Sequence, residues 1–144
     1  MKIEMTDEEL YNWVFKIADT FYDLVYKDVW FKKIFRNIEQ DSITAQQTDF
    51  MVQNMGGPKR FSGRDAKDAH PQIWIDENIW NYREDLLKKA FKEVNAPAEI
   101  CELWLKIDNA FKLSIINKGG VEECVGRFKT DEIIYEPMPD YLKK

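Results

Sequence analysis

Four stretches of this 144-residue sequence repeat their apolar residues at intervals of three and four, at positions 10–25, 43–54, 79–94 and 100–115. This spacing places side chains on one face of an α-helix, and no stretch alternates with the period of two that is typical of strands. The chain is long enough to form one domain with a core. We therefore predict an all-α domain, whose irregular middle at 59–75 distinguishes it from a simple four-helix bundle.

Residues typical of helix ends border these stretches. Cap candidates are found at Thr6 with Glu9, at Asp41 and Ser42, at Asp76, and at Asn95 with Pro97. Stop signals are found at Gly56-Gly57-Pro58 for the second helix and at Gly119-Gly120 for the fourth. We further expect a tight helical corner in "VWFKKIF" at 29–35 and a short helix at 65–69. The tail at 121–144 is expected to add a short helix or strand near 132–135.

Composition disfavours several classes of partner. The net charge of −5 argues against nucleic acid, because neutralising phosphates requires a basic surface. No apolar run reaches the ~18–20 residues that cross a bilayer. The N-terminus also lacks the layout of a secretory signal, so we expect a cytoplasmic protein with no membrane partner. In that compartment Cys101 and Cys124 are expected to be reduced.

The second apolar stretch contains an amide. Its predicted helix face carries Ile43, Gln47, Phe50, Met51 and Asn54. A buried amide without a partner costs ~1–3 kcal/mol. Gln47 is therefore expected either at the edge of this face or beside a polar partner in the interior.

His70 is the only histidine in the chain. No motif for nucleophilic catalysis or phosphate binding accompanies it, and one histidine without a carboxylate cluster is too few for a zinc or di-iron site. Haem iron needs one strong protein ligand and a pocket of large apolar side chains, and 14% of this chain is aromatic. Lone histidines are more often structural or exposed, so composition leaves the role of His70 open.

Short motifs occur at fixed spacing around these residues. The motif "FYDLVYKD" contains Tyr22 and Asp28, and Phe35 follows Tyr22 by thirteen residues. Ile43 lies eight residues beyond Phe35, and "FMVQNMGGP" follows it. The glycine of "RFSG" lies seven residues before His70, and "NAPAEI" opens the last helix. Over about residues 10–116 this pattern resembles the truncated haemoglobins, which are short two-over-two helical globins of bacteria, plants and protists.

The resemblance implies a globin-like two-over-two helical sandwich around haem b in residues 1–118, followed by an extension of unknown role at 119–144. It implies that His70 binds the iron and that Tyr22 and Gln47 donate hydrogen bonds to a ligand across the iron. The other positions that it places at the haem are Phe35, Ile43, Gln46, Phe50, Met51, Arg64, Lys67, Ile75 and Trp80. Arg64 and Lys67 would pair with the propionates. From the residues alone, the alternatives to these ligand-binding roles are that Tyr22 is a core residue and that Gln47 lies at the edge of its helix.

Two features depart from the family's pattern. The glycine pair that usually separates the first two helices is absent, so "VFKIADTF" predicts one continuous helix with the A helix fused or lost. Arg83 stands thirteen residues after His70, where the family has an apolar residue or a tryptophan. Either Trp80 takes that place or an arginine approaches the haem edge.

The implied function is binding of dioxygen, nitric oxide or carbon monoxide, for storage, transport or sensing. The alternative is a redox enzyme supplied by a reductase, with nitric oxide dioxygenase, peroxidase-like or nitrite-reductase-like activity. A third interpretation is a haem-free helical interaction domain that kept the fold. We expect a monomer or a weak homodimer.

Overall fold

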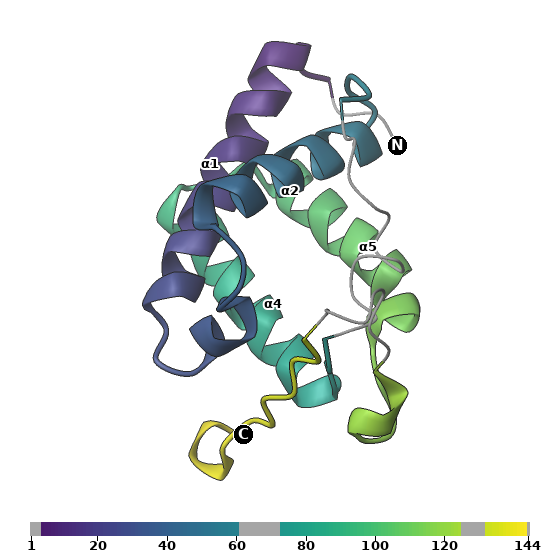
Figure 1. The fold of residues 1–144 in the computed structure, drawn as a ribbon. Helices are drawn as coiled ribbons and strands as arrows, with labels where there is room; N and C mark the ends of the chain where they lie inside the picture. Colours follow the sequence, from purple (N-terminus) through teal and green to yellow (C-terminus); the bar gives the residue numbers. More distant parts are fainter. Residues whose placement is uncertain (1–3, 61–72, 125–131, 144) are drawn as a thin grey trace.

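The computed structural model describes residues 4–60, 73–124 and 132–143. The helices of these ranges are α1 (Asp7–Lys27), α2 (Gln40–Asn54), α4 (Glu77–Glu93) and α5 (Ala98–Ile115), with the 3₁₀ turns η1 (Phe31–Phe35), η2 (Val121–Glu123) and η3 (Asp140–Leu142). Figure 1 shows α1 crossed by α2, and α4 followed by α5. Within these ranges the only β pairing is a single bridge, so the all-α prediction is confirmed.

Helix α1 is continuous, as the missing glycine pair predicts. Its capping box forms: the Thr6 hydroxyl accepts from the Glu9 amide and the Glu9 carboxylate accepts from the Thr6 amide, both at 3.1 Å. The helix packs against α2 and α4 through one face. The buried residues of that face are Leu10, Val14, Ile17, Ala18, Phe21, Tyr22 and Val25.

Helix α2 differs from its prediction in its start and in its buried face. It begins at Gln40 with Glu39 as N-cap and no side-chain cap, so the expected caps at Asp41 and Ser42 are wrong. The buried side chains are Thr44, Thr48, Met51 and Val52. Both threonine hydroxyls donate to carbonyls four residues earlier, at 2.9 and 2.7 Å, which satisfies them inside the core. The side chains that were predicted to form the apolar face of α2, apart from Met51, therefore do not lie on its most buried side.

Helix α4 begins at the predicted position, whereas α5 begins at Ala98 with Pro97 as N-cap and no side-chain cap, so the expected cap at Asn95 is wrong. The Asp76 carboxylate accepts from the Ile79 amide at 2.9 Å and caps α4, as predicted. Helix α5 ends before the glycine pair, because Asn117 leaves the helix to pair with Ile75. The Ile75 amide donates to Asn117 Oδ1 at 2.9 Å, and the Asn117 amide donates to the Ile75 carbonyl at 2.6 Å.

An aromatic cluster fills the corner between α1 and α4. Its rings belong to Tyr26, Trp30, Phe31, Phe35 and Tyr82. Asp28 organises the corner: Oδ1 accepts from the amides of residues 30 and 31, and Oδ2 accepts from the Tyr82 hydroxyl. The predicted tight corner is therefore the 3₁₀ turn η1, and Asp28 of the motif has a structural role in it.

The described part of the tail packs against the domain. Ile134 forms the single β bridge with Ile73, and the Trp74 and Tyr135 rings lie 4.8 Å apart. Arg36 binds Glu132 at 2.9 Å and a second tail carboxylate, that of residue 136, at 3.0 Å. The expected element near 132–135 is thus one bridge residue and neither a helix nor a strand.

Two further expectations from the sequence concern the state of the cysteines and the presence of a membrane-spanning helix. Cys101 and Cys124 are both free thiols, as expected for a reduced protein. None of the described helices is long and apolar enough to cross a membrane.

Candidate functional site

Tyr22 is a buried phenol on α1. It is 5% exposed, and its ring meets the Phe35 ring edge-on at 5.9 Å and the Phe21 ring at 4.9 Å. Within the part of the chain that the structure describes, its hydroxyl makes no hydrogen bond. Burial raises the pKa of Tyr22, and the positive charge of Arg83 opposes that rise. The phenol therefore keeps its proton and can donate it.

The predicted residues of α2 lie on two faces of the helix. Ile43, Gln47 and Phe50 are half-buried, and the Phe50 ring lies 5.4 Å from the Phe111 ring of α5. Met51 is fully buried in the core, whereas Gln46 is exposed. Gln47 thus lies on a partly covered face, which fits the first of its two expected positions, at the edge of the apolar face.

The remaining described candidates are Ile75 and Trp80. Ile75 is half-buried and is held by its two hydrogen bonds with Asn117. Trp80 is buried on α4, and the Arg83 guanidinium carbon lies 5.3 Å from its ring centroid. The sequence posed Trp80 and Arg83 as alternatives, but the structure places the two side chains in contact.

Arg83 belongs to a partly buried ionic cluster, which we define as Arg83, Glu84 and Asp108. Its Nη1 lies 2.8 Å from Asp108 Oδ2 and 3.3 Å from Glu84 Oε1. The Asp108 side chain is 8% exposed and that of Arg83 is 21% exposed. Burial favours a lower pKa for the guanidinium, but the carboxylate of Asp108 raises it above its ordinary value. Arg83 is therefore a partly buried cation.

Sequence reasoning missed Asp108. It lies four residues after Trp104 and three before Phe111, which is the spacing of the apolar residues of α5. A carboxylate at such a position is the signal that could have revealed it, because a buried charge needs a partner.

Replacing Glu84 with glutamine is expected to change how stability depends on pH. Burial raises the pKa of Glu84 to about 7 from 4.5, so the folded chain binds this proton more tightly than the unfolded chain. The resulting stability is fully present below pH 4.5 and is lost as pH rises through about 7. Because Glu84 is partly solvated, we expect Glu84→Gln to be more stable than the parent by only ~1 kcal/mol at ~pH 8.

Urea unfolding at ~pH 4 and ~pH 8 measures this difference. Glu93→Gln, an exposed substitution on the same helix, is the control and should change stability little at either pH. A gain for Glu84→Gln that is equal at the two pH values would contradict the linkage.

Three predicted residues, Arg64, Lys67 and His70, lie outside the described residues, as does the short helix expected at 65–69. Their proposed roles at a haem therefore stay predictions.

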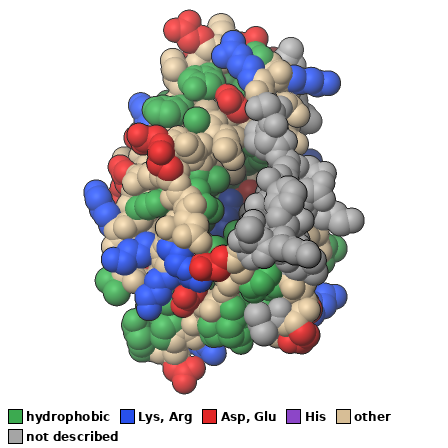
Figure 2. All heavy atoms as spheres, in the orientation of Figure 1, with side chains coloured by type: hydrophobic (Ala, Val, Ile, Leu, Met, Phe, Trp, Pro, Cys, Tyr) green, Lys and Arg blue, Asp and Glu red, His purple; other side chains and the backbone are tan. Residues whose placement is uncertain are grey.

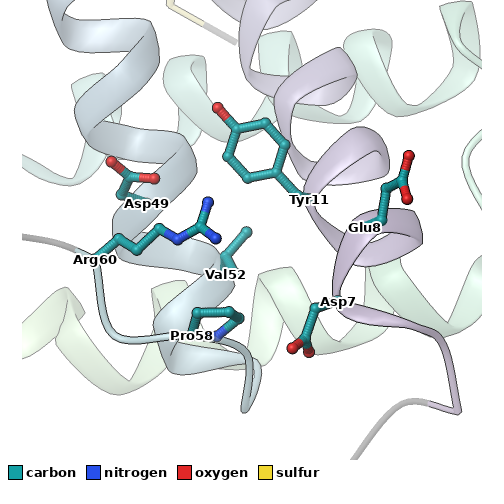
Figure 3. A pocket seen from close by; sticks show the side chains of 7 residues that line it. All are labelled: Asp7, Glu8, Tyr11, Asp49, Val52, Pro58 and Arg60. Carbon is teal, nitrogen blue, oxygen red and sulfur yellow. The ribbon is translucent and has the colours of Figure 1, made fainter.

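A surface pocket lies elsewhere, between the start of α1 and the end of α2. It has a volume of about 350 Å³ and is lined by Asp7, Glu8, Tyr11, Asp49, Val52, Pro58 and Arg60. Figure 3 shows the Arg60 guanidinium reaching into it between α1 and α2. A second pocket of about 410 Å³ is lined by residues 76–78, 112–113 and 116–118. Neither is lined by a residue that the sequence predicts at the haem.

Known proteins resemble this chain in fold. A crystal structure of a truncated hemoglobin variant from Tetrahymena pyriformis, in its Fe(III) form, superposes with a TM-score of 0.68 at 24% identity. The match covers 79% of this chain and 100% of that one. A second variant of the same protein gives a TM-score of 0.68 at 23% identity. These matches confirm an all-α globin fold, which places the chain in the class of globin-fold proteins.

The sequence matches agree with this class. The family model of the bacterial-like globins matches residues 10–117, and the chain belongs to that family. A group 1 truncated hemoglobin from Tetrahymena pyriformis is 40% identical over 50 residues, which are 35% of this chain and 41% of that protein. Two-on-two hemoglobin-3 from Arabidopsis thaliana is 38% identical over 59 residues, 40% of this chain and 32% of that protein. The alignments therefore span less than half the length of either relative.

Proposed function

We propose that this chain binds haem b through His70 and takes up a diatomic ligand at the iron, with dioxygen as the first candidate. The observation that carries the proposal is Tyr22, a buried phenol whose hydroxyl has no acceptor among the described residues. The fully buried polar atoms that lack a partner among the described residues are Trp30 Nε1 and Trp104 Nε1, and the Tyr22 hydroxyl is not one of them. A phenol that donates to no described residue can still donate a hydrogen bond to a group that enters the site. The names of the related truncated hemoglobins support haem as the group.

The described surroundings fit a flat apolar cofactor. Ile43 and Phe50 leave part of their surface uncovered on α2, and Phe35 is likewise half-buried beside Tyr22. Figure 2 shows hydrophobic side chains, in green, exposed at several places on the face that it draws. Large apolar side chains with a few polar groups are the usual lining of cofactor sites. Haem, when bound, supplies an iron that takes diatomic ligands.

The chain's own residues would hold and stabilise that ligand. The Tyr22 hydroxyl donates a hydrogen bond to a ligand atom that carries partial negative charge, and the buried rings around it exclude water. The Gln47 amide is proposed as a second donor. Phe35 packs on the tyrosine ring and holds its orientation. Both donors would slow ligand release, because the hydrogen bonds must break before the ligand leaves.

The proposal assigns the remaining predicted residues to cofactor binding. Arg64 and Lys67 would pair with the propionates, and residues 1–118 would form the haem domain with 119–144 as an extension. We also propose a cytoplasmic location and a monomer or weak homodimer. Storage, transport and sensing require reversible binding, whereas a redox role such as nitric oxide dioxygenation requires a reductase and a fast reaction of the oxygenated form.

Addition of hemin to the purified chain tests the proposal. The wild-type protein is expected to give a Soret band at about one hemin per chain and a five-coordinate spectrum when reduced. His70→Gly should lose that ferrous spectrum, because it removes the only imidazole of the chain. Added imidazole should restore it, which separates loss of the ligand from loss of the fold. A wild-type chain without a Soret band, or a His70→Gly variant with an unchanged spectrum, would show the proposal to be wrong.

A further inference from the structure

Tyr82 and Asp28 form a hydrogen-bonded pair that the proposed function does not use. The Tyr82 hydroxyl on α4 donates to Asp28 Oδ2 at 2.5 Å, a length typical of a hydroxyl that donates to a charged oxygen. The other oxygen of this side chain, Oδ1, accepts from the amides of residues 30 and 31 at 3.0 and 2.6 Å. These bonds hold Oδ2 in front of the phenol, within the reach over which a proton can pass.

This pairing distinguishes Tyr82 from the other five tyrosines of the chain. Within the described ranges, none of those five donates to a carboxylate. The Tyr26 hydroxyl donates to the Ile38 carbonyl at 2.7 Å, and Tyr22 donates to no described residue. A backbone carbonyl accepts a hydrogen bond but does not take up a proton near neutral pH, whereas a carboxylate does. Tyr82 is therefore the tyrosine with a base at its hydroxyl.

A base at the hydroxyl decides which phenol loses an electron. Removal of one electron makes the hydroxyl a strong acid, and a phenol that keeps its proton becomes a cation, which is costly away from water. A phenol that passes its proton to a neighbour ends as a neutral radical and avoids this cost. Burial and the hydrogen bond to Asp28 raise the pKa of Tyr82, so the phenol holds its proton until an electron leaves.

Trp30 lies beside this pair and has no such outlet. Its ring is perpendicular to the Tyr82 ring at a centroid distance of 5.2 Å. The side chain is 3% exposed, and its Nε1 has no hydrogen-bond partner among the described residues. An oxidised Trp30 therefore remains a buried cation, and it regains its electron from the ring in contact that can release a proton. An electron vacancy in this corner thus moves to Tyr82.

We propose that Tyr82 is a redox-active tyrosine, the main site at which a one-electron oxidant attacks this chain, with Asp28 as its proton acceptor. The oxidant, a ruthenium(III) complex or an oxidising radical, takes one electron and is reduced. The O–H bond of Tyr82 breaks, and the proton forms an O–H bond with Asp28 Oδ2. The products are a neutral phenoxyl radical and a carboxylic acid, and return of an electron and of this proton restores the pair. The reaction needs no haem, so the inference goes beyond the proposed function and fails independently of it.

The test oxidises the full-length, haem-free chain with ruthenium(III) tris-bipyridine, generated by light and persulfate. Tyr82 is half-buried, so the complex can approach it. Electron paramagnetic resonance with ring-deuterated tyrosine measures the tyrosyl radical. Tyr82→Phe keeps the ring and is expected to lower this signal by at least half. Tyr26→Phe is the matched control, because it removes a hydroxyl of the same aromatic cluster that donates to a carbonyl, and it should leave the signal unchanged.

Two further measurements test the role of Asp28. Asp28→Asn keeps an oxygen for the two amides but removes the base, and it is expected to slow formation of the radical at least tenfold in transient absorption. For the parent chain, heavy water is expected to slow formation at least twofold, because the proton moves together with the electron.

Several results would overturn the proposal. An unchanged signal in Tyr82→Phe would mean that the radical forms elsewhere, for example on Tyr141, which is 77% exposed. An equal loss in Tyr26→Phe would mean that the whole cluster, and not one hydroxyl, controls the reaction. A folded Asp28→Asn variant that is oxidised as fast as the parent would exclude Asp28 as the proton acceptor. If Asp28→Asn does not fold, the isotope measurement on the parent decides, and equal rates in light and heavy water overturn the proposal.

Discussion

Replacing Asp108 with alanine is expected to lower the free energy of unfolding by about 3 kcal/mol. The substitution removes the nearest carboxylate of Arg83, whose Nη1 lies 2.8 Å from Asp108 Oδ2. The guanidinium then stays partly buried beside two rings, with the 3.3 Å contact to Glu84 as its remaining ion pair among the described residues. Breaking a buried pair costs about 3–5 kcal/mol when one charge is left alone. The remaining contact with Glu84 places the expected loss at the lower end of this range.

Urea unfolding of the haem-free chain, followed by far-ultraviolet circular dichroism, measures this loss. The matched control is Glu102→Ala, which removes an exposed carboxylate from the same helix and should change stability by less than about 0.5 kcal/mol. The double variant Arg83→Leu/Asp108→Leu should recover most of the loss, because it leaves no uncompensated charge from this pair. A loss for Asp108→Ala as small as that of the control would show that solvent stabilises the guanidinium as well as the Asp108 carboxylate does.

The helices could be predicted because their signals are local. Apolar spacing of three and four, together with a capping box at Thr6 and a cap at Asp76, depends on residues within a few positions of each other. The buried face of α2 could not be read in this way. Thr44 and Thr48 look polar in a sequence, yet each hydroxyl bonds a carbonyl of its own helix and the residue packs as a small apolar group.

The contact between two candidate residues could be predicted in the same way. A motif of fixed spacing brought Tyr22 and Phe35 together, and their rings are in contact. The pairing of Arg83 with Asp108 joins two helices across 25 residues, so no local pattern contains it. Local spacing therefore identified Arg83 as a departure from the family, but only the packing of α4 against α5 shows how the charge is held.

Replacing Tyr22 with phenylalanine is expected to speed dioxygen dissociation from the haem-loaded ferrous protein at least tenfold. Losing one hydrogen bond to a ligand of partial negative charge costs about 1.4 kcal/mol, which corresponds to a factor of ten. The haem-free variant should be as stable as the parent or slightly more stable, because the Tyr22 hydroxyl has no partner among the described residues. Tyr22→Phe is thus expected to speed ligand release without lowering the stability of the fold.

Stopped-flow displacement of dioxygen by carbon monoxide measures the rate. Tyr26→Phe is the matched control, since this tyrosine lies one turn further along α1 and its hydroxyl donates to the Ile38 carbonyl at 2.7 Å. The control should lose some stability, as expected when an intramolecular hydrogen bond is removed, and should leave the dissociation rate nearly unchanged. If Tyr22→Phe and Tyr26→Phe release dioxygen at the same rate as the parent, Tyr22 is a core residue and the buried donor does not face the ligand.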